Sequence, residues 1–170
     1  MLTKSQLSRL VADLRANADK QGRIVLHQVN EDGPDTYCCL GRVAVVLGPD
    51  VGVAPGGKTE QNCVKYEGNS YSLGCKLAEL FGSIDGRTDT WPNAREVIEE
   101  IWDRKFRLPE GVKEKTTTKP LSYIYRGNTP CLISLNDSWG WSFPEIAELL
   151  ERCYPAIEDP TNPPQTPTSA

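Results

Sequence analysis

The chain has 170 residues, 38% of them hydrophobic, and a formal net charge of −4 from 19 Lys and Arg against 23 Asp and Glu. This length suits one domain with its own core, and the mild acidity argues against a dedicated nucleic-acid binder, which usually carries a basic surface. No apolar run approaches the roughly 20 residues that a membrane span needs, and the first residues lack the apolar centre of a secretory signal. We therefore expect a cytoplasmic protein.

The first part of the chain predicts a helix and then a β-hairpin. Thr3 and Gln6 have the spacing of a capping box, and the apolar residues that follow recur at helical spacing, so we expect a helix that ends near Asn17. Residues 23–29 are rich in β-branched and apolar side chains, which favours a strand. The turn formers of residues 30–35 then predict that the chain folds back along this strand.

The next apolar run, residues 40–47, is compatible with two structures. We favour a helix closed by Gly48 and Pro49, because the apolar positions fall on one helical face, but the same run also has the composition of a buried strand. Residues 48–61 are rich in Gly and Pro and predict a loop. Residues 64–72 predict a small hairpin.

Two further helices are predicted in the second half of the chain. Thr90 is expected to cap the first, with Pro92 in its first turn and an apolar stripe behind it. Ser142 and Glu145 form a second capping box, which follows a short apolar run and a polar turn. The stripe after this box consists of four residues, Ile146, Leu149, Leu150 and Cys153.

These elements predict an α+β fold, a helix-rich single domain with short antiparallel β-hairpins. A short helix ending at Gly82 and a strand over residues 121–125 complete the prediction. The domain is expected to span residues 1–154, with 83–130 as a candidate insertion. Residues 155–170 are rich in Pro and poor in apolar side chains, so we expect a disordered tail.

Several short motifs occur along the chain, namely Leu14-Arg15, Lys20-Gln21-Gly22, Tyr37-Cys38-Cys39-Leu40-Gly41, Leu135-Asn136-Asp137, Gly140, Ser142-Phe143 and Glu145-Ile146-Ala147. Together they resemble a family of small, mostly uncharacterised bacteriophage proteins. The resemblance implies an accessory protein that works in the cytoplasm of a phage host. It implies no particular reaction, because the family has no settled activity.

Two nucleotide- or DNA-binding motifs are matched in letters but not in context. Residues 52–59 satisfy the P-loop pattern, which needs a buried strand before it and a long helix after it, and neither is predicted here. Residues 142–147 resemble the first helix of a helix-turn-helix unit, but the chain meets Pro155 where the recognition helix should begin. We interpret residues 52–59 as an ordinary flexible loop.

The sequence gives little support for catalysis or for a metal site. The six Cys have no metal-ligand spacing, and we interpret them as small buried hydrophobic residues. The one His, His27, could reach Cys38 or Cys39 across the hairpin, but no surrounding motif supports a nucleophile. We expect no catalytic residue, no metal and no cofactor.

A set of polar and aromatic residues beside the recognisable segments predicts a site for a small anionic ligand. Cationic side chains pair with phosphate, Trp faces stack on bases, and Asn or Asp bonds to sugars or base edges. The alternative is that these residues are turn, cap and packing residues. The predicted ligand-binding residues are Lys20, Gln21, Arg23, Arg42, Asn136, Asp137, Trp139 and Trp141.

The function predicted from the sequence is that of a phage-encoded, non-enzymatic accessory protein. We expect it to sequester a nucleotide-derived host immune signal. The first alternative is an inhibitor that binds the surface of a host protein, and the second is an enzyme that processes nucleotides. Self-association into a homo-oligomer is left open, and neither a nucleic acid nor a membrane is expected as a partner.

Overall fold

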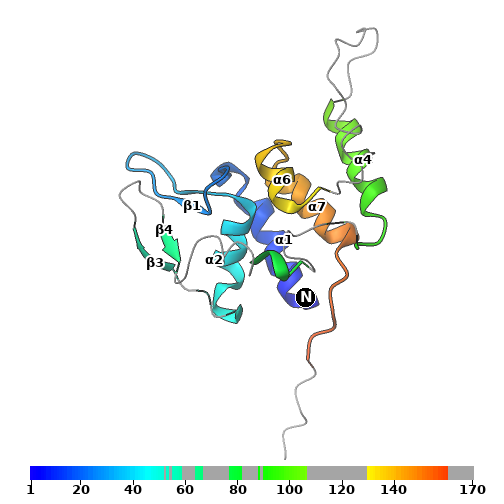
Figure 1. Cartoon of the computed structure of the whole chain (residues 1–170), viewed down its shortest axis with the longest axis horizontal. Helices are drawn as coiled ribbons and strands as arrows, with labels where there is room; N and C mark the ends of the chain where they lie inside the picture. Colours follow the sequence, from blue (N-terminus) through cyan, green and yellow to red (C-terminus); the bar gives the residue numbers. More distant parts are fainter. Residues whose placement is uncertain are drawn as a thin grey trace, which may run out of the picture.

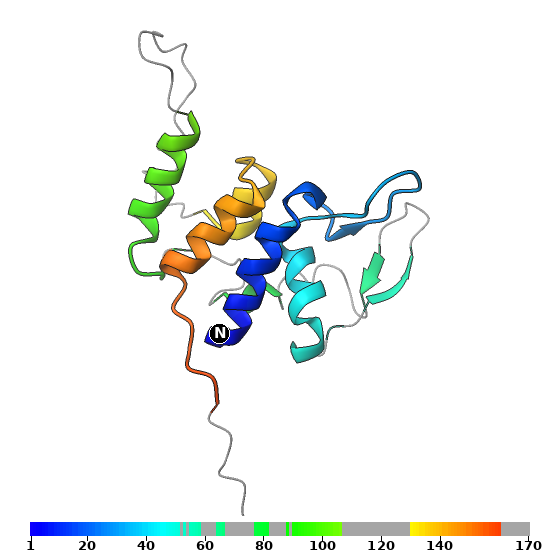
Figure 2. The same cartoon turned by 180° about the vertical axis from the view of Figure 1, so that it is seen from behind.

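The computed structural model describes residues 1–51, 53, 55–58, 64–66, 77–81, 88, 90–106 and 130–160. The fold is a helix-rich α+β domain with two short antiparallel hairpins, as the sequence predicts. Figure 1 shows the helices α1, α2, α6 and α7 grouped at the centre, with the hairpins on one side and α4 on the other; Figure 2 shows the same arrangement from behind.

Helix α1 spans Lys4–Ala16 and begins as its sequence predicts. The Thr3 hydroxyl accepts from the backbone N–H of Gln6, and the Gln6 side chain accepts from the N–H of Thr3. This capping box satisfies two amide groups that would otherwise lack partners at the helix start. The predicted end near Asn17 is also confirmed, and a short 3₁₀ helix, η1, follows at Ala18–Lys20.

The first hairpin is confirmed, but its strands are shorter than predicted. β1 (His27–Gln28) pairs with β2 (Thr36–Tyr37), and the Asn30 side chain donates to the carbonyl of Pro34 within the turn. The prediction of a strand from residue 23 is wrong, because Ile24 has a φ of 69° and interrupts the extended backbone. Residues 23–26 form an irregular segment instead.

Helix α2 spans Cys39–Val51, which decides between the two structures predicted for this run in favour of a helix. The predicted end at Gly48 and Pro49 is wrong, because the helix continues through Pro49. The Asp50 carboxylate bonds to Arg9 and Gln6 of α1, and these contacts hold the last turn of α2 against α1. Tertiary contacts therefore extend the helix past a residue that usually ends one.

The second hairpin corrects the interpretation of the Gly-rich stretch. β3 (Pro55–Lys58) pairs antiparallel with β4 (Val64–Tyr66). The predicted loop over 48–61 is therefore wrong for residues 48–51, which belong to α2, and for residues 55–58, which form β3. In a P-loop, residues 55–58 would belong to a loop that leads into a helix, whereas here they form a strand. The predicted partner strand of β4 within residues 64–72 lies outside the described residues.

Helix α4 spans Ala94–Phe106, so its start is later than the predicted cap at Thr90. Residues 90–93 form a turn, in which Asn93 has a φ of 57° and the Trp91 backbone N–H donates to the carbonyl of Thr88. The predicted apolar stripe is confirmed for Val97, Ile98 and Ile101, which are buried. Residues 77–79 form part of the predicted short helix, while 121–125 lie outside the described residues.

The apolar run before the polar turn forms a short helix, α6 (Leu132–Asp137), and α7 follows at Phe143–Cys153. The capping box at the start of α7 is confirmed: Glu145 accepts hydrogen bonds from the backbone and hydroxyl of Ser142. The predicted stripe is confirmed too, since Ile146, Leu149, Leu150 and Cys153 are all buried.

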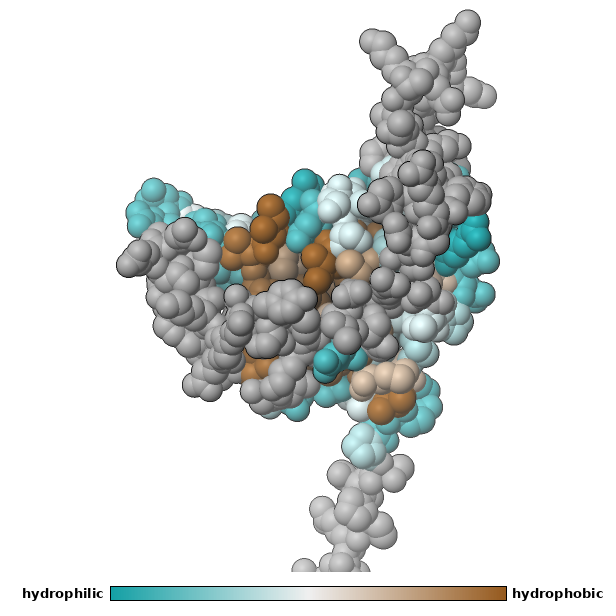
Figure 3. Space-filling view, viewed as in Figure 1, coloured by the Kyte–Doolittle hydropathy of each residue, from teal (hydrophilic) through white to brown (hydrophobic). Residues whose placement is uncertain are grey.

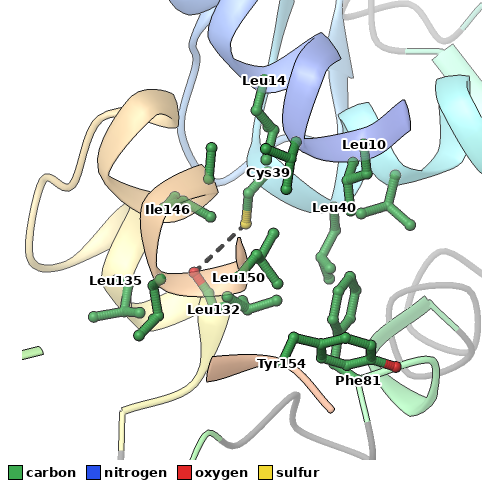
Figure 4. Packing of buried hydrophobic residues seen from close by; sticks show 14 of the residues in the cluster. Leu10, Leu14, Cys39, Leu40, Phe81, Leu132, Leu135, Ile146, Leu150 and Tyr154 are labelled. Atoms are coloured by element: carbon green, nitrogen blue, oxygen red, sulfur yellow. Dashed lines mark hydrogen bonds between the residues drawn. The ribbon is translucent and has the colours of Figure 1, made fainter. Parts of the chain in front are cut away.

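The core lies where α1 packs against α7 on one side and α2 on the other, with α6 closing one end. Figure 4 shows Leu10 and Leu14 of α1 facing Leu132, Ile146 and other apolar side chains of α2, α6 and α7. Fully burying one such side chain stabilises the fold by roughly 1.5–3 kcal/mol. None of the helices among the described residues has the length and apolar character needed to cross a membrane.

The chain after α7 differs from the predicted disordered tail over residues 155–160. Ile157 forms a parallel bridge with Thr3, its N–H donates to the carbonyl of Leu2, and its carbonyl accepts from the N–H of Lys4. The Asp159 carboxylate also accepts from the backbone N–H of Ser5 in the first turn of α1. An acidic group there offsets the positive end of the helix dipole.

Candidate ligand-binding site

The structure brings together the two segments that carry most of the predicted ligand-binding residues. We call residues 20–24 the basic segment and residues 136–141 the α6–α7 turn. They are more than a hundred residues apart in sequence, yet side chains from each bond to the backbone of the other. The sequence singles out residues of both segments but does not show that they bond to one another.

Gln21 joins the two segments through both ends of its amide. Its Nε2 donates to Asn136 Oδ1 at 2.8 Å and to the carbonyl of Trp141 at 2.7 Å. Its Oε1 accepts from the backbone N–H of Phe143 at 2.8 Å, a group at the start of α7 that has no partner within the helix. The Gln21 amide is therefore engaged within the fold.

Asn136 and Asp137 continue this network at the end of α6. The Asn136 side chain is fully buried, and its Nδ2 donates to the carbonyl of Gly22 at 3.1 Å and to Asp137 Oδ1 at 2.6 Å. The same Asp137 oxygen accepts from the backbone N–H of Ile24 at 3.0 Å. These bonds fix the backbone of the basic segment over α6, and they agree with the interpretation of Asn136 and Asp137 as turn and cap residues.

Arg42 lies apart from this network, in the contact between α1 and α2. Its guanidinium is buried and donates to both carboxylate oxygens of Asp13, with Nε at 2.8 Å from Oδ2. Its Cζ also lies 4.7 Å from the ring centroid of Tyr37, in cation–π range. This position gives Arg42 a packing role, and its contact with a ligand remains a prediction.

The two Trp of the turn have different environments. Trp141 is fully buried in the core, and its indole Nε1 has no hydrogen-bond partner among the described residues. Trp139 is half-buried, and its ring meets that of Trp102 edge-on, with centroids 5.7 Å apart. Of the two rings, Trp139 is the one with surface left to contact a ligand.

The basic side chains of residues 20–24 differ from the other basic side chains that the structure describes, because they lack ion pairs. Among the residues whose side chains the structure describes, Lys20 and Arg23 are the basic ones that form neither an ion pair nor a side-chain hydrogen bond. Each of the other basic side chains in that set forms an ion pair with a carboxylate, namely Lys4, Arg9, Arg15, Arg42, Arg95, Arg104, Lys105 and Arg152.

Arg23 is exposed and reaches across the α6–α7 turn. A Cβ built on Gly140 would lie 3.0 Å from its Nη2, so the guanidinium rests against this glycine. Gly140 has a φ of 64°, which favours glycine here as well. The structure thus places beside the turn that carries Trp139 a positive charge with no partner among the described residues.

The structure also places the residues considered for catalysis. Cys38 and Cys39 are buried, and burial raises the pKa of Cys38 to about 11 and the pKa of Cys39 well above its ordinary value. Because the thiolate is the nucleophile, these shifts oppose a catalytic role at neutral pH. His27 Nε2 instead lies 2.7 Å from Asp35 Oδ2, and its ring stacks on that of Tyr37.

Of the cysteines that the structure describes, Cys38, Cys39 and Cys153 are buried as predicted, whereas Cys131 is half-buried and its Sγ accepts from the N–H of Ser134 at the start of α6. Cys38, Cys39, Cys131 and Cys153 are free thiols, and Figure 4 shows Cys39 Sγ donating to the carbonyl of Leu132. Within the described part of the chain, no three His, Cys, Asp or Glu side chains are grouped in a way that could hold a metal ion. Cys63 and Cys75 lie outside that part.

Comparisons with protein-family models, with curated proteins and with solved structures found no match for this chain.

Sequence reasoning missed one residue of the basic segment, Ile24. Its side chain is 83% exposed, and its φ of 69° is rare for a β-branched residue. In the sequence, Ile24 looks like one of several apolar residues of a predicted strand. Its backbone N–H donates to the carboxylate of Asp137, which lies in a distant part of the chain, so no local pattern reveals this conformation.

Proposed function

We propose that this protein is a non-enzymatic binding protein, that its partner carries negative charge, and that residues 20–24 form the binding segment. The observation that carries the proposal is the charge of this segment. Lys20 and Arg23 lack the carboxylate partners that the other described basic side chains have. A partner that supplies a phosphate or carboxylate would gain charge-assisted hydrogen bonds without first breaking an ion pair of the fold.

The first candidate partner is a small nucleotide-like anion. Arg23 would pair with phosphate, and the half-buried ring of Trp139 would contact a base across the same turn. The network of Gln21, Asn136 and Asp137 supports this role indirectly, because it holds the binding segment in one conformation. In the context of the phage resemblance, such a protein would sequester a nucleotide-derived immune signal of the host.

The second candidate partner is the surface of a host protein, which the protein would inhibit by occupying it. The exposed side chain of Ile24 favours this candidate, because an apolar group held out into solvent gains most when another surface covers it. Both candidates use the same positive charges.

The proposal is tested by titrating the purified protein with cyclic and linear nucleotides while following Trp fluorescence and the melting temperature. Arg23→Ala and Lys20→Ala should each weaken binding by about tenfold or more, since a hydrogen bond to a charged group contributes about 1.5–3 kcal/mol. Arg15→Ala is the control, because Arg15 is also exposed, as Arg23 is, but is paired with Glu151.

Recovery of unchanged nucleotide from the complex by mass spectrometry supports sequestration, while recovery of a cleaved product points to an enzyme. If no nucleotide binds, the small-ligand candidate is rejected. If Arg23→Ala and Lys20→Ala bind every partner as well as the unmodified protein does, the charge-based proposal is wrong.

A further inference from the structure

The most unusual exposed residue that the structure describes is Ile24. A β-branched side chain in the left-handed region is strained by its own Cβ, and Gly or Asn would adopt this conformation more easily. The side chain is 83% exposed, so packing within the described chain does not offset this strain. Strain of this kind collects at functional sites. The residue is thus unfavourable for the fold, and its apolar side chain faces solvent.

The backbone around Ile24 is held in place from several sides. Its N–H donates to Asp137 at 3.0 Å, the N–H of Gly22 donates to the carbonyl of Tyr37 at 2.6 Å, and the N–H of Val25 donates to the carbonyl of Arg23 at 2.7 Å. A loop fixed in this way loses little conformational entropy when a partner covers it. Ile24 therefore has the geometry of a rigid apolar projection.

The charges beside this projection indicate the chemistry of its partner. Arg23 is the preceding residue and Lys20 lies four positions earlier, and both are unpaired among the described residues. The segment carries these two positive charges on a chain whose net charge is −4, and the carboxylate of Asp137 is bonded to its backbone. A complementary surface carries acidic groups around an apolar pocket.

Other partners suit this surface less well. Two cations contribute only about 2 kcal/mol to the free energy of binding to an anionic membrane. The side chain of one Ile buries far less apolar area than a helix that lies in the membrane interface. A nucleic acid would need a longer basic surface. Figure 3 shows hydrophobic residues between the hydrophilic β1–β2 turn and the α4 side.

We propose that Ile24 is the apolar anchor of a protein-docking surface, and that the partner is a protein whose acidic surface surrounds an apolar pocket for this side chain. The inference rests on the proposed function, since Arg23 and Lys20 supply the charge complementarity. It adds the anchor and commits to a protein as the partner. Rigid apolar side chains at the centre of an interface commonly dominate its affinity.

The test uses the immobilised full-length protein and a displayed library of random peptides. The enriched peptides should combine acidic residues with a large apolar residue, and a synthetic copy should bind in solution. Ile24→Gly and Ile24→Asn should weaken this binding at least tenfold, while the melting temperature stays the same or rises, because both residues relieve the backbone strain. Val45→Ala is the control, since Val45 is also exposed but lies on α2.

The possible outcomes distinguish the role of Ile24 from the roles of Lys20 and Arg23. If no acidic, apolar peptide is enriched, or if Ile24→Gly and Ile24→Asn leave the affinity unchanged, the docking surface is rejected. If Ile24→Gly weakens binding but Arg23→Ala and Lys20→Ala do not, the anchor stands and the charge-based proposed function is wrong. Binding to phosphatidylglycerol vesicles that is lost in Ile24→Gly, without peptide binding, would replace the protein partner by a membrane.

Discussion

Replacing Gln21 by Ala should destabilise the protein far more than its half-buried position suggests. The substitution removes hydrogen bonds to Asn136 and Trp141 and the one from the N–H of Phe143, all between 2.7 and 2.8 Å. At about 1 kcal/mol for each net hydrogen bond, the loss is about 3 kcal/mol. A protein of this length loses about 2–4 °C of melting temperature per kcal/mol, so we expect a decrease of about 10 °C.

Gln21→Glu tests the same network with nearly the same side-chain shape. The introduced carboxylate still accepts from Phe143, but its second oxygen faces Asn136 Oδ1 and the Trp141 carbonyl, both acceptors. Facing acceptors favour the protonated form, so folding should raise the pKa of the introduced carboxyl. The folded state of the variant then binds the proton more tightly than the unfolded state. Its stability relative to the unmodified protein should increase as the pH falls and decrease as the pH rises.

The stability of both variants is measured by urea unfolding and by thermal melting between acidic and neutral pH. Asp19→Ala is the control, because Asp19 is an exposed neighbour whose replacement should change the free energy of unfolding by less than about 0.5 kcal/mol. A loss below about 1 kcal/mol for Gln21→Ala, or a Gln21→Glu variant that does not recover in acid, would refute the network as a determinant of the fold. Either result would also remove the argument that the basic segment is held rigidly.

Three further predictions follow from the packing. Arg42→Ala should lower the free energy of unfolding by about 2–3 kcal/mol in urea melts, because it leaves the carboxylate of Asp13 partly buried without its partner, and Arg42→Lys should lose less. Deleting 157–170 should lower the melting temperature by roughly several degrees through lost backbone bonds to the N-terminal residues, whereas deleting 161–170 should hardly change it. Because burial raises the pKa of Cys38 to about 11 and also raises the pKa of Cys39, folded stability should fall as the pH rises from about 9 to 11. A Cys38→Ala variant should show a weaker pH dependence, to which Cys39 still contributes, and an alkaline profile identical to that of the unmodified protein would contradict the prediction.

The helices with local start signals were predictable from sequence. Thr3 with Gln6 and Ser142 with Glu145 are bonded within one turn, so no distant part of the chain is needed to form them. The apolar stripes behind them are also local, because helical spacing alone puts their residues on one face. This is why α1 and α7, which pack together at the centre of the core, match the prediction.

The elements that sequence reasoning placed wrongly depend on contacts made over long distances. Helix α2 passes Pro49 because Asp50 is held by Arg9 of α1, which no local pattern reveals. The strand predicted from residue 23 is interrupted at Ile24 because Asp137 accepts its N–H. Residues 155–160 are too polar to predict as ordered, yet their backbone bonds to the start of α1.

The sequence singles out the residues of the candidate site but not the contacts that they make within the fold. Lys-Gln-Gly and Leu-Asn-Asp stand out as turn-like segments, but the sequence cannot show that Gln21 bonds to Asn136. Nor can it separate a buried Arg42 from an exposed Arg23, because both are single basic residues beside apolar runs. The contacts of these side chains become visible only in the folded structure, where the basic segment meets the α6–α7 turn.

Whether a side chain already forms hydrogen bonds within the fold also decides how easily a partner can bind it. For Gln21 to bind a ligand with its amide, it would have to give up the three hydrogen bonds described above, and a cost of about 3 kcal/mol corresponds to roughly a hundredfold loss of affinity. Arg23 and Ile24 carry no such cost, because their side chains make no hydrogen bond or ion pair with the described chain. The amide network therefore positions the basic segment, and the exposed side chains that it holds in place are the ones free to bind.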